Sequence, residues 1–388
     1  MTVFQVDQAR AEAAPRAYLV TVAVGRQASP DSSGELTQLA QSGGLDPVGL
    51  MQARRDKPDP ATYIGSGKVE ELKTAVAGAE AGLVVFDAAL SAAPQRSLER
   101  ALDCAVVDRT ALILDIFRQR AKSREGRLQV ELASLEHLSA RLVRGWTHLE
   151  RQRGGLSKTG GPGEKQIELD RRMIGVRVKQ LREKLRQLER QRHTQRRSRA
   201  RSDVLSVSLV GYTNAGKSTL FNALTRAGAY AADQLFATLD TTSRRCYVGE
   251  GVNVVLSDTV GFIRGLPHQL VEAFKSTLDE TARADLLLHV VDAASPAREE
   301  QIAEVERVLA EIGADHVPRV LVLNKIDLAQ RAPSTEGPDS RGNIAVVSVS
   351  AAQGLGLELL REAIAQCARS ALEPVPPGEV VERLEQPA

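Results

Sequence analysis

Apolar and polar positions along the first 115 residues alternate between short apolar runs and segments with helical spacing. Strands that alternate with helices are typical of a small α/β domain. We therefore predict an N-terminal α/β domain over residues 1–115. Its strands are expected at 18–24, 83–87 and 105–108, and its helices at 68–77 and 94–102.

Two long amphipathic stripes follow the first domain. Their apolar residues recur at intervals of three and four, as on one face of a helix. The stripes consist of Leu128, Leu132, Leu135, Leu138, Leu142, Trp146 and Leu149, and then Ile174, Val178, Leu181, Leu185 and Leu188. The stretch between them, residues 151–163, has five glycines and one proline and cannot pack a core. We predict an antiparallel helical hairpin over 116–202, with this glycine-rich segment at its exposed tip.

From residue 204 onward the pattern changes to repeated units of strand, loop and helix. The strands are nearly continuous apolar runs, which indicates that both faces of their sheet are buried. The runs are VLSVSLV, VNVVLSD, DLLLHVVD, RVLVLNK and IAVVSVS. The fold class is therefore α/β, with a doubly wound sheet over 203–372. Residues 329–343 are predicted to form a polar loop, and 373–388 a mobile C-terminal tail.

Composition places the chain among ordinary globular proteins. It has 388 residues, of which 43% are hydrophobic and 26% charged. No apolar run is long enough to cross a bilayer, and the first seventeen residues carry no signal peptide, so we expect a cytoplasmic protein without stable membrane insertion. The three cysteines are Cys104, Cys246 and Cys367, far apart in the sequence, which favours neither disulfides nor a zinc site.

The net charge of +2 hides a strong asymmetry along the chain. Residues 118–201 hold 24 Lys and Arg against 9 Asp and Glu. A one-sided positive balance of this size indicates a polyanionic partner for the hairpin. A solvated helix pair would explain the charge but not its sign.

A phosphate-binding loop is predicted at residues 211–218. GYTNAGKS fits the pattern GxxxxGK[ST] directly after a strand and before a helix. In this setting backbone amides converge on the α and β phosphates, Lys217 reaches the β and γ oxygens, and the Ser218 hydroxyl binds Mg²⁺. The nucleotide-binding residues predicted here are Gly211, Tyr212, Thr213, Asn214, Ala215, Gly216, Lys217, Ser218 and Thr219.

Two further motifs are expected to serve the metal and the γ-phosphate. Asp258 ends a strand and is placed to hold the Mg²⁺ shell, while the amide of Gly261 can meet the γ-phosphate. Thr238 could close on the metal only when a third phosphate is present, which makes its segment a switch. The motifs are Asp258, Thr259, Val260 and Gly261, and Phe236, Ala237, Thr238, Leu239 and Asp240. We predict catalytic roles for Lys217, Thr238 and Gly261, and metal ligation by Ser218 and Thr238.

Guanine specificity is indicated after two later strands. A carboxylate at Asp327 can accept two hydrogen bonds from guanine N1 and N2, which adenine does not offer. Ser350 and Ala351 could present a backbone amide to guanine O6. The predicted base-binding residues are Asn324, Lys325, Ile326, Asp327, Ser350 and Ala351. The chain is therefore expected to bind GTP and GDP and to hydrolyse GTP with Mg²⁺.

The chain resembles the HflX family of GTPases from about residue 18 to residue 372. The resemblance is carried by YIGSGKVEEL, GGPGEKQIELDRR, GYTNAGKSTLFNAL, FATLDTT and DTVGFI. It implies an N-terminal α/β domain with a helical arm, a GTPase domain, and association with the large ribosomal subunit and its rRNA, where the protein releases or splits stalled or idle ribosomes. We expect a monomer and no DNA partner.

Four positions leave alternatives open. Phe262 stands where many small GTPases carry a water-orienting glutamine, so hydrolysis must use another group or a partner, and the ring also packs the switch. Asn214 resembles an asparagine that coordinates K⁺ in related GTPases, but it also suits a turn. Residues 65–68 (GSGK) favour a turn and helix start over a second nucleotide loop. His289 is expected in the core.

Two other functions remain to be tested. One is a GTPase acting in ribosome assembly or on another RNA. The other, an ATP-driven RNA remodeller, is disfavoured by Asp327.

Overall fold

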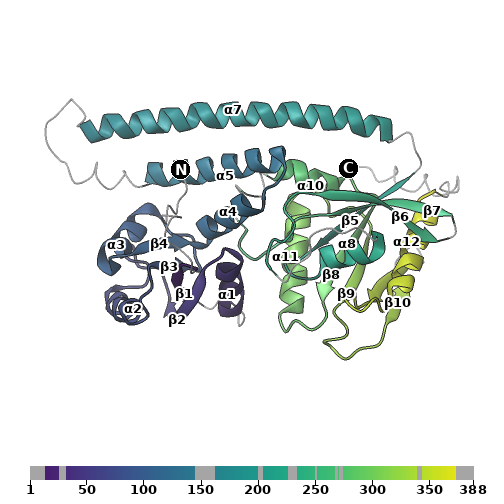
Figure 1. Ribbon diagram of the computed structural model, residues 1–388, viewed down its shortest axis with the longest axis horizontal. Coiled ribbons are helices and arrows are strands. Elements are labelled where there is room, and N and C mark those ends of the chain that lie inside the picture. The colour runs from purple at the N-terminus through teal and green to yellow at the C-terminus, as the bar shows by residue number, and fades with distance from the viewer. Residues whose placement is uncertain are drawn as a thin grey trace, which may run out of the picture. The chain divides into compact units, whose positions relative to one another are not determined.

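A computed structural model describes residues 14–25, 32–144, 162–199, 204–225, 234–249, 251–266, 270, 274–338 and 343–372. The chain forms two compact units. The first comprises Met1–Arg199, Ala232–Asp240 and Ile263–Thr277, and the second comprises Ala200–Ala231, Thr241–Phe262 and Leu278–Ala388. Each unit has its own sheet (Figure 1). Two short segments from the later part of the sequence therefore belong to the N-terminal unit.

The first unit is built on a four-stranded parallel sheet with the order β2-β1-β3-β4. Its strands are β1 (Arg16–Val24), β2 (Asp46–Arg55), β3 (Leu83–Phe86) and β4 (Ala105–Asp108). The helices around it are α1 (Ser32–Ser42), α2 (Ser66–Gly78), α3 (Ala92–Leu102) and α4 (Arg109–Arg120).

The core of this unit follows from the alternation of side chains along the strands. Val20 and Val84 are fully buried in one cluster with Leu72 of α2 and Leu98 of α3. Their neighbours in the strands point to the opposite face, where α1 and α4 lie. The helices α2 and α3 thus cover one face of the sheet and α1 and α4 cover the other, as in other α/β folds.

The arm consists of α5 (Arg124–Arg144) and α7 (Pro162–Arg199), which lie alongside each other (Figure 1). Leu181, in the second predicted stripe, is completely buried. Arg177 bonds Glu131 at 2.8 Å and Arg182 bonds Glu136 at 2.8 Å, so ion pairs flank the seam. The glycine-rich tip lies almost entirely outside the described residues, and its hairpin geometry stays a prediction.

The second unit is a seven-stranded sheet with the order β10-β11-β9-β8-β5-β7-β6. The pairs β10–β11 and β6–β7 are antiparallel, and the other pairs are parallel. The strands are β5 (Leu205–Gly211), β6 (Thr242–Gly249), β7 (Val252–Asp258), β8 (Leu286–Asp292), β9 (Arg319–Asn324), β10 (Ser334–Pro338) and β11 (Ile344–Ser348). The helices are α8 (Lys217–Thr225), α10 (Lys275–Ala282), α11 (Arg298–Glu311) and α12 (Leu357–Leu372).

Both faces of this sheet are covered, as the continuous apolar strands predict. Phe221 of α8 and Leu360 of α12 pack with Leu288 of β8 on one face. His289, the next residue of β8, is 2% exposed and therefore belongs to the core, as predicted. The mixed α/β fold with two sheets thus confirms the fold class.

Two expectations were incomplete or wrong. The polar segment 329–343, predicted as a loop, contains β10, an exposed strand that pairs with β11 at the edge of the sheet. An edge strand needs no apolar run because only one of its sides bonds another strand, and Pro338 is tolerated there. The N-terminal sheet also has a strand, β2, that no apolar run in the sequence indicates.

Among the described residues, no helix is long and apolar enough to cross a membrane. The same part of the chain holds no cluster of three His, Cys, Asp or Glu that could bind a metal ion.

Candidate nucleotide-binding site

The predicted phosphate loop joins β5 to α8 and depends on glycine at two positions. Gly211 has φ 148°, and a Cβ atom there would lie 2.1 Å from the carbonyl oxygen of Val290 in β8. Gly216 has φ 91°, and its Cβ would lie 2.2 Å from Nδ2 of Asn324. Both sites combine a left-handed backbone with contact too close for a side chain. The two glycines therefore let the loop pass tightly over the ends of β8 and β9.

Lys217 begins α8 and is buried beneath the loop, with 7% of its surface exposed. Its ammonium donates hydrogen bonds to the carbonyl oxygens of Gly211 at 3.1 Å and Tyr212 at 2.8 Å. Burial lowers the pKa of Lys217 to about 8, and the nearby carboxylate of Asp258 opposes this shift. A desolvated ammonium next to backbone amides is suited to bind phosphate oxygens.

The end of β7 brings an acidic side chain to the first turn of α8. Oδ2 of Asp258 accepts a hydrogen bond from the Ser218 hydroxyl at 2.7 Å, and Asp258 is 1% exposed. Such an arrangement of hydroxyl and carboxylate oxygens fits the ligand preference of Mg²⁺. A Cβ at Gly261 would lie 2.9 Å from Nζ of Lys217, so the backbone comes close to the lysine here.

Phe262 is tied to the phosphate loop by its backbone. Its amide donates to the carbonyl of Gly211 at 3.1 Å, and its carbonyl accepts from the amide of Thr213 at 2.7 Å. The side chain is completely buried. The prediction that this residue packs as an apolar group is confirmed, and its ring offers no hydrogen bond to a water.

Asn324 connects three of the predicted motifs. Its Nδ2 donates to the carbonyl of Ala215 at 2.9 Å, and its Oδ1 accepts from the amide of Ala351 at 3.0 Å. Asn324 is 2% exposed. The Ala351 amide therefore bonds a side chain in this structure, and its role toward guanine O6 stays a prediction.

Two charged residues follow Asn324. Lys325 has φ 63° and pairs through Nζ with Asp292 at 2.8 Å. Asp327 carries a buried Oδ1 atom without a hydrogen-bond partner among the described residues. Buried carboxylate oxygens normally find a donor, so an orphaned one next to a nucleotide motif favours a ligand that brings the donor.

The predicted switch residues 236–240 make their described contacts elsewhere, within the N-terminal unit. The ring of Phe236 meets that of Phe117 in α4 edge to face, with centroids 4.7 Å apart. The carboxylate of Asp240 accepts hydrogen bonds from the backbone amides of Lys122 at 2.9 Å and Ser123 at 2.8 Å. The predicted switch residues therefore belong to the first unit, whereas the phosphate loop, residues 258–261 and the predicted base-binding residues belong to the second.

The segment after Phe262 is held by the N-terminal unit as well. Arg109, which begins α4, forms ion pairs with Glu35 and Asp87 and donates to the carbonyl of Arg264 at 3.0 Å. Arg264 also pairs with Asp87 at 3.2 Å. Burial lowers the pKa of Arg109, but the two carboxylates outweigh burial and raise it above its ordinary value. Phe274 completes this contact by packing against Phe117 at 5.0 Å.

Sequence reasoning did not identify Asp292 or the partners of the switch residues. Asp292 ends β8 directly beside Asn324 in register, and the shared position at the strand ends could have indicated it. The contacts of Ser123 and Phe117 with the switch span more than a hundred residues of sequence, and no local pattern signals them.

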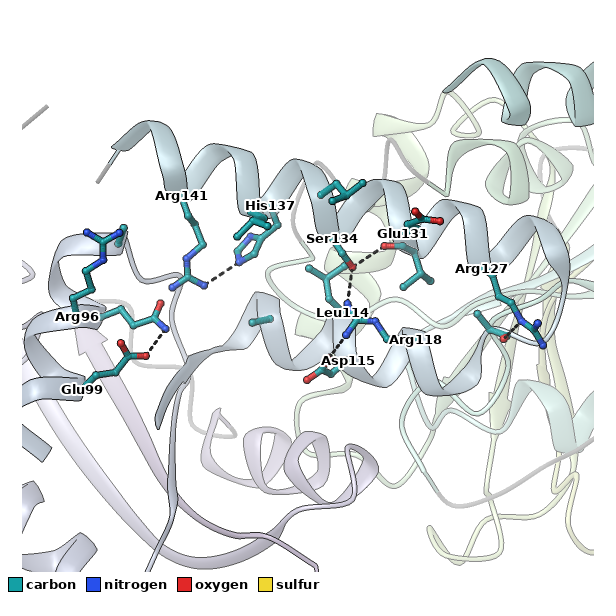
Figure 2. Close-up of a pocket in the computed structure, with 17 residues that line it drawn as sticks. Arg96, Glu99, Leu114, Asp115, Arg118, Arg127, Glu131, Ser134, His137 and Arg141 are labelled. Carbon is teal, nitrogen blue, oxygen red and sulfur yellow. Dashed lines mark hydrogen bonds and ion pairs between the residues drawn. The ribbon is translucent and has the colours of Figure 1, made fainter. Parts of the chain in front are cut away.

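A cavity of about 710 Å³ lies in the N-terminal unit between α3, α4 and α5, and Figure 2 shows its lining. Arg118 on its wall bonds Asp115 at 3.2 Å, and Arg141 lies 3.3 Å from His137. Burial lowers the pKa of His137. The charge of Arg141 lowers this pKa further, and the carboxylate of Asp108 partly raises it again. None of the predicted nucleotide motifs lines this cavity.

Three family models match consecutive parts of the chain. They are described as GTP-binding GTPase N-terminal (residues 31–118), GTP-binding GTPase Middle Region (120–199) and 50S ribosome-binding GTPase (206–325). Together they extend from the start of α1 through the arm to the end of β9.

Curated relatives match over most of the chain. GTPase HflX of Escherichia coli is 49% identical over 92% of this chain and 84% of its own length. GTPase HflX of Magnetococcus marinus is also 49% identical, over 87% of this chain and 78% of its own length. The crystal structure of the SsGBP and GDP complex has a similar fold, with TM-score 0.50 and 24% identity over 92% of this chain and 99% of that chain. The chain therefore belongs to the HflX family of GTPases.

Proposed function

We propose that this GTPase binds the large ribosomal subunit in its GTP state, lays its basic arm against rRNA, and separates stalled or idle ribosomes into subunits. It acts as a monomer in the cytoplasm, and GTP hydrolysis releases it. The observation that carries the proposal is the location of the switch segment 236–240. This segment is packed into the same unit as the basic arm, so a change at the nucleotide has a direct route to an RNA-binding element.

The charge of the arm supports an RNA partner. Arg171, Arg172 and Lys179 are exposed on α7 and have no acidic partner among the described residues. Other arm arginines, such as Arg177, are neutralised by acidic residues of α5. Unpaired cations along one helix are the electrostatic footprint of a protein that binds nucleic acid. The description of the third matched family model, a 50S ribosome-binding GTPase, agrees with this partner.

The nucleotide chemistry is assigned to the second unit. Lys217 and the loop amides bind the phosphates, and the carboxylate of Asp327 reads the guanine base. Ser218 and Asp258 fit Mg²⁺, which would neutralise charge on the phosphate oxygens, and Thr238 joins them when the switch closes. These assignments rest on the donor set at α8 and on the orphaned Asp327 oxygen.

Hydrolysis needs help from outside the described site. Phe262 is buried and offers no group to orient the attacking water. We propose that the ribosome supplies the missing alignment, and that K⁺ beside Asn214 assists it. The left-handed backbone of Asn214, with φ 62°, also suits the alternative role as a turn residue.

Sedimentation tests the ribosome assignment. The full chain is mixed with 50S subunits or 70S ribosomes under GTP, GDP or a non-hydrolysable GTP analogue. The particles are separated on a sucrose gradient, and the 50S and 70S fractions are assayed for the protein. We expect cosedimentation with 50S in the presence of the analogue but not of GDP, and a loss of the 70S peak. The triple variant Arg171→Gln, Arg172→Gln, Lys179→Gln should cosediment weakly.

A matched control uses basic residues that are equally exposed but lie off the arm. Arg244→Gln with Arg245→Gln changes two exposed side chains of β6 and should bind like the wild type. If the arm variant binds 50S subunits as well as the wild type does, these three cations do not contact rRNA. If binding to 50S is the same with GDP and with the GTP analogue, the nucleotide does not control binding and the switch has no part in it.

A further inference from the structure

The carboxylate of Asp240 is held by the start of the arm helix α5. Its Oδ2 accepts from two consecutive backbone amides, those of Lys122 and Ser123, and its Oδ1 accepts from the Ser123 hydroxyl. The Ser123 hydroxyl in turn accepts from the amide of Gly126 at 2.8 Å. A negative group at the first turn of a helix satisfies free amides and meets the positive end of the helix dipole. Asp240 is thus part of the N-terminal cap of α5, although it is 117 residues away from Ser123 in sequence.

The contact requires glycine at position 126. A Cβ on Gly126 would lie 2.4 Å from Oδ1 of Asp240 and 3.1 Å from the Ser123 hydroxyl. Its neighbour Arg127, labelled in Figure 2, donates through Nε to the carbonyl of Ala121 at 3.3 Å and steadies the turn before α5. The start of the arm helix is therefore shaped to receive this carboxylate.

A second anchor lies on the other side of Thr238. The ring of Phe236 is 2% exposed and packs on Phe117, while the amide of Leu235 donates to the Ser42 hydroxyl at 3.0 Å. Thr238 lies two residues after one anchor and two residues before the other. Since two residues of extended chain span at most about 7 Å, Thr238 cannot move far while both anchors hold.

We propose that Ser123 and Gly126 are positioning residues that hold the switch through Asp240 and oppose the closure of Thr238 on the metal. GTP binding then releases Asp240 from α5, and the arm helix loses part of its cap. The inference rests on the proposed role of Thr238 as a metal ligand in the GTP state. Because coupling is reciprocal, weakening the Asp240 contact must favour GTP over GDP to the extent that closure breaks it.

The test substitutes glycine in two helices of the arm. Gly126→Ala places a methyl group against Asp240, whereas Gly175→Ala in α7 meets no atom within 4 Å. Alanine is the better helix former at both positions, so neither change weakens its helix by propensity. The measured quantities are the dissociation constants of the full chain for GDP and for a non-hydrolysable GTP analogue.

For Gly126→Ala we expect the ratio of analogue affinity to GDP affinity to rise roughly 2- to 30-fold, the range expected for losing a helix cap. The affinity of Gly126→Ala for GDP should equal that of the wild type. Gly175→Ala should have wild-type affinities for both nucleotides. Ser123→Ala should act in the same direction, and Ser123→Thr, which keeps the hydroxyl, should restore the wild-type ratio. An unchanged or lowered ratio in Gly126→Ala would overturn the proposal.

Hydrogen exchange gives an independent readout. In the wild type, the amides of Lys122 and Ser123 should exchange faster with the analogue than with GDP, since both donate to the Asp240 carboxylate. Equal exchange in both states would contradict the release. Thr238→Ala distinguishes a failure of this inference from a failure of the proposed function. If Thr238→Ala leaves the affinity for the analogue unchanged, Thr238 is not a ligand in the GTP state and the proposed switch is wrong. If Thr238→Ala lowers that affinity but Gly126→Ala has no effect, only the role of the Asp240 contact is wrong.

Discussion

At the scale of single residues, Asp327 offers the sharpest test of base recognition. Its orphaned carboxylate oxygen would accept hydrogen bonds from guanine N1 and N2. Asp327→Asn removes two charge-assisted bonds of roughly 1.5 to 3 kcal/mol each, so we expect xanthine nucleotides to bind better than GTP. Competition between GDP and xanthosine diphosphate measures the change. Asp315→Asn, an exposed position in the same unit, serves as control, and retained preference for GDP in Asp327→Asn would contradict the assignment.

Lys217 gives nucleotide binding a dependence on pH. Burial lowers its pKa to about 8 in the free protein, and bound phosphate would raise it again. Above pH 8 the free lysine is neutral, so binding must take up a proton. We therefore expect the dissociation constant for GDP to increase by up to about tenfold per pH unit above pH 8 and to be flat below it. Guanosine, which lacks phosphates, should show no such slope, and a matching slope for guanosine would assign the effect to another group.

The residues of the site differ in how far the sequence predicts them. The phosphate loop, Asp258 and the segment 324–327 are recognisable because each motif is local and lies at a strand end. Asn324 could be placed in the motif, but its bonds to Ala215 and Ala351 come from distant segments. Such contacts depend on strand order, which the spacing of residues within one motif does not encode.

At the scale of elements, the start of α4 depends on a buried charge. Arg109 is flanked by two carboxylates that are themselves largely buried. Arg109→Met removes the buried cation that both carboxylates share and leaves Asp87 its ion pair with Arg264. Because breaking a buried ion pair leaves buried charge poorly compensated, we expect the N-terminal sheet to lose about 3 to 5 kcal/mol of stability. Hydrogen exchange of β3 and β4 amides measures the free energy of opening. Arg100→Met on the exposed side of α3 should change it by less than about 0.5 kcal/mol, and equal values for the two variants would contradict the role of Arg109.

Elements with a clear apolar pattern, either one apolar face or a continuous apolar run, were predictable, and elements without such a pattern were not. The helix α4 (RTALILDIFRQR) is buried at eight positions around its circumference, so it has no amphipathic stripe to detect. The strand β2 (DPVGLMQARR) has only two buried positions because it lies at the edge of its sheet. The continuous strands of the second unit, buried on both faces, were the easiest to find.

At the scale of the whole molecule, we expect the isolated protein to hydrolyse GTP slowly. Phe262 cannot orient water, so hydrolysis must use another group or a partner. Large ribosomal subunits should raise turnover strongly, because supplied catalytic groups can contribute roughly 10³ to 10⁵ in rate. Phosphate release with and without 50S subunits measures the effect. Lys217→Ala reports background hydrolysis, and equal wild-type rates in both conditions would exclude the ribosome as activator.

The chain crosses between the two units several times, and this has a consequence for making chimeras of these proteins. Residues 232–240 and 263–277 are encoded within the later half of the chain but pack with the earlier half. A chimera joined at a single point near residue 203 would pair a foreign Phe236 with a native Phe117, and a foreign Asp240 with a native Ser123. A chimera that keeps these contacts must exchange residues 1–199, 232–240 and 263–277 together. The unit that can be exchanged between relatives is therefore discontinuous in sequence.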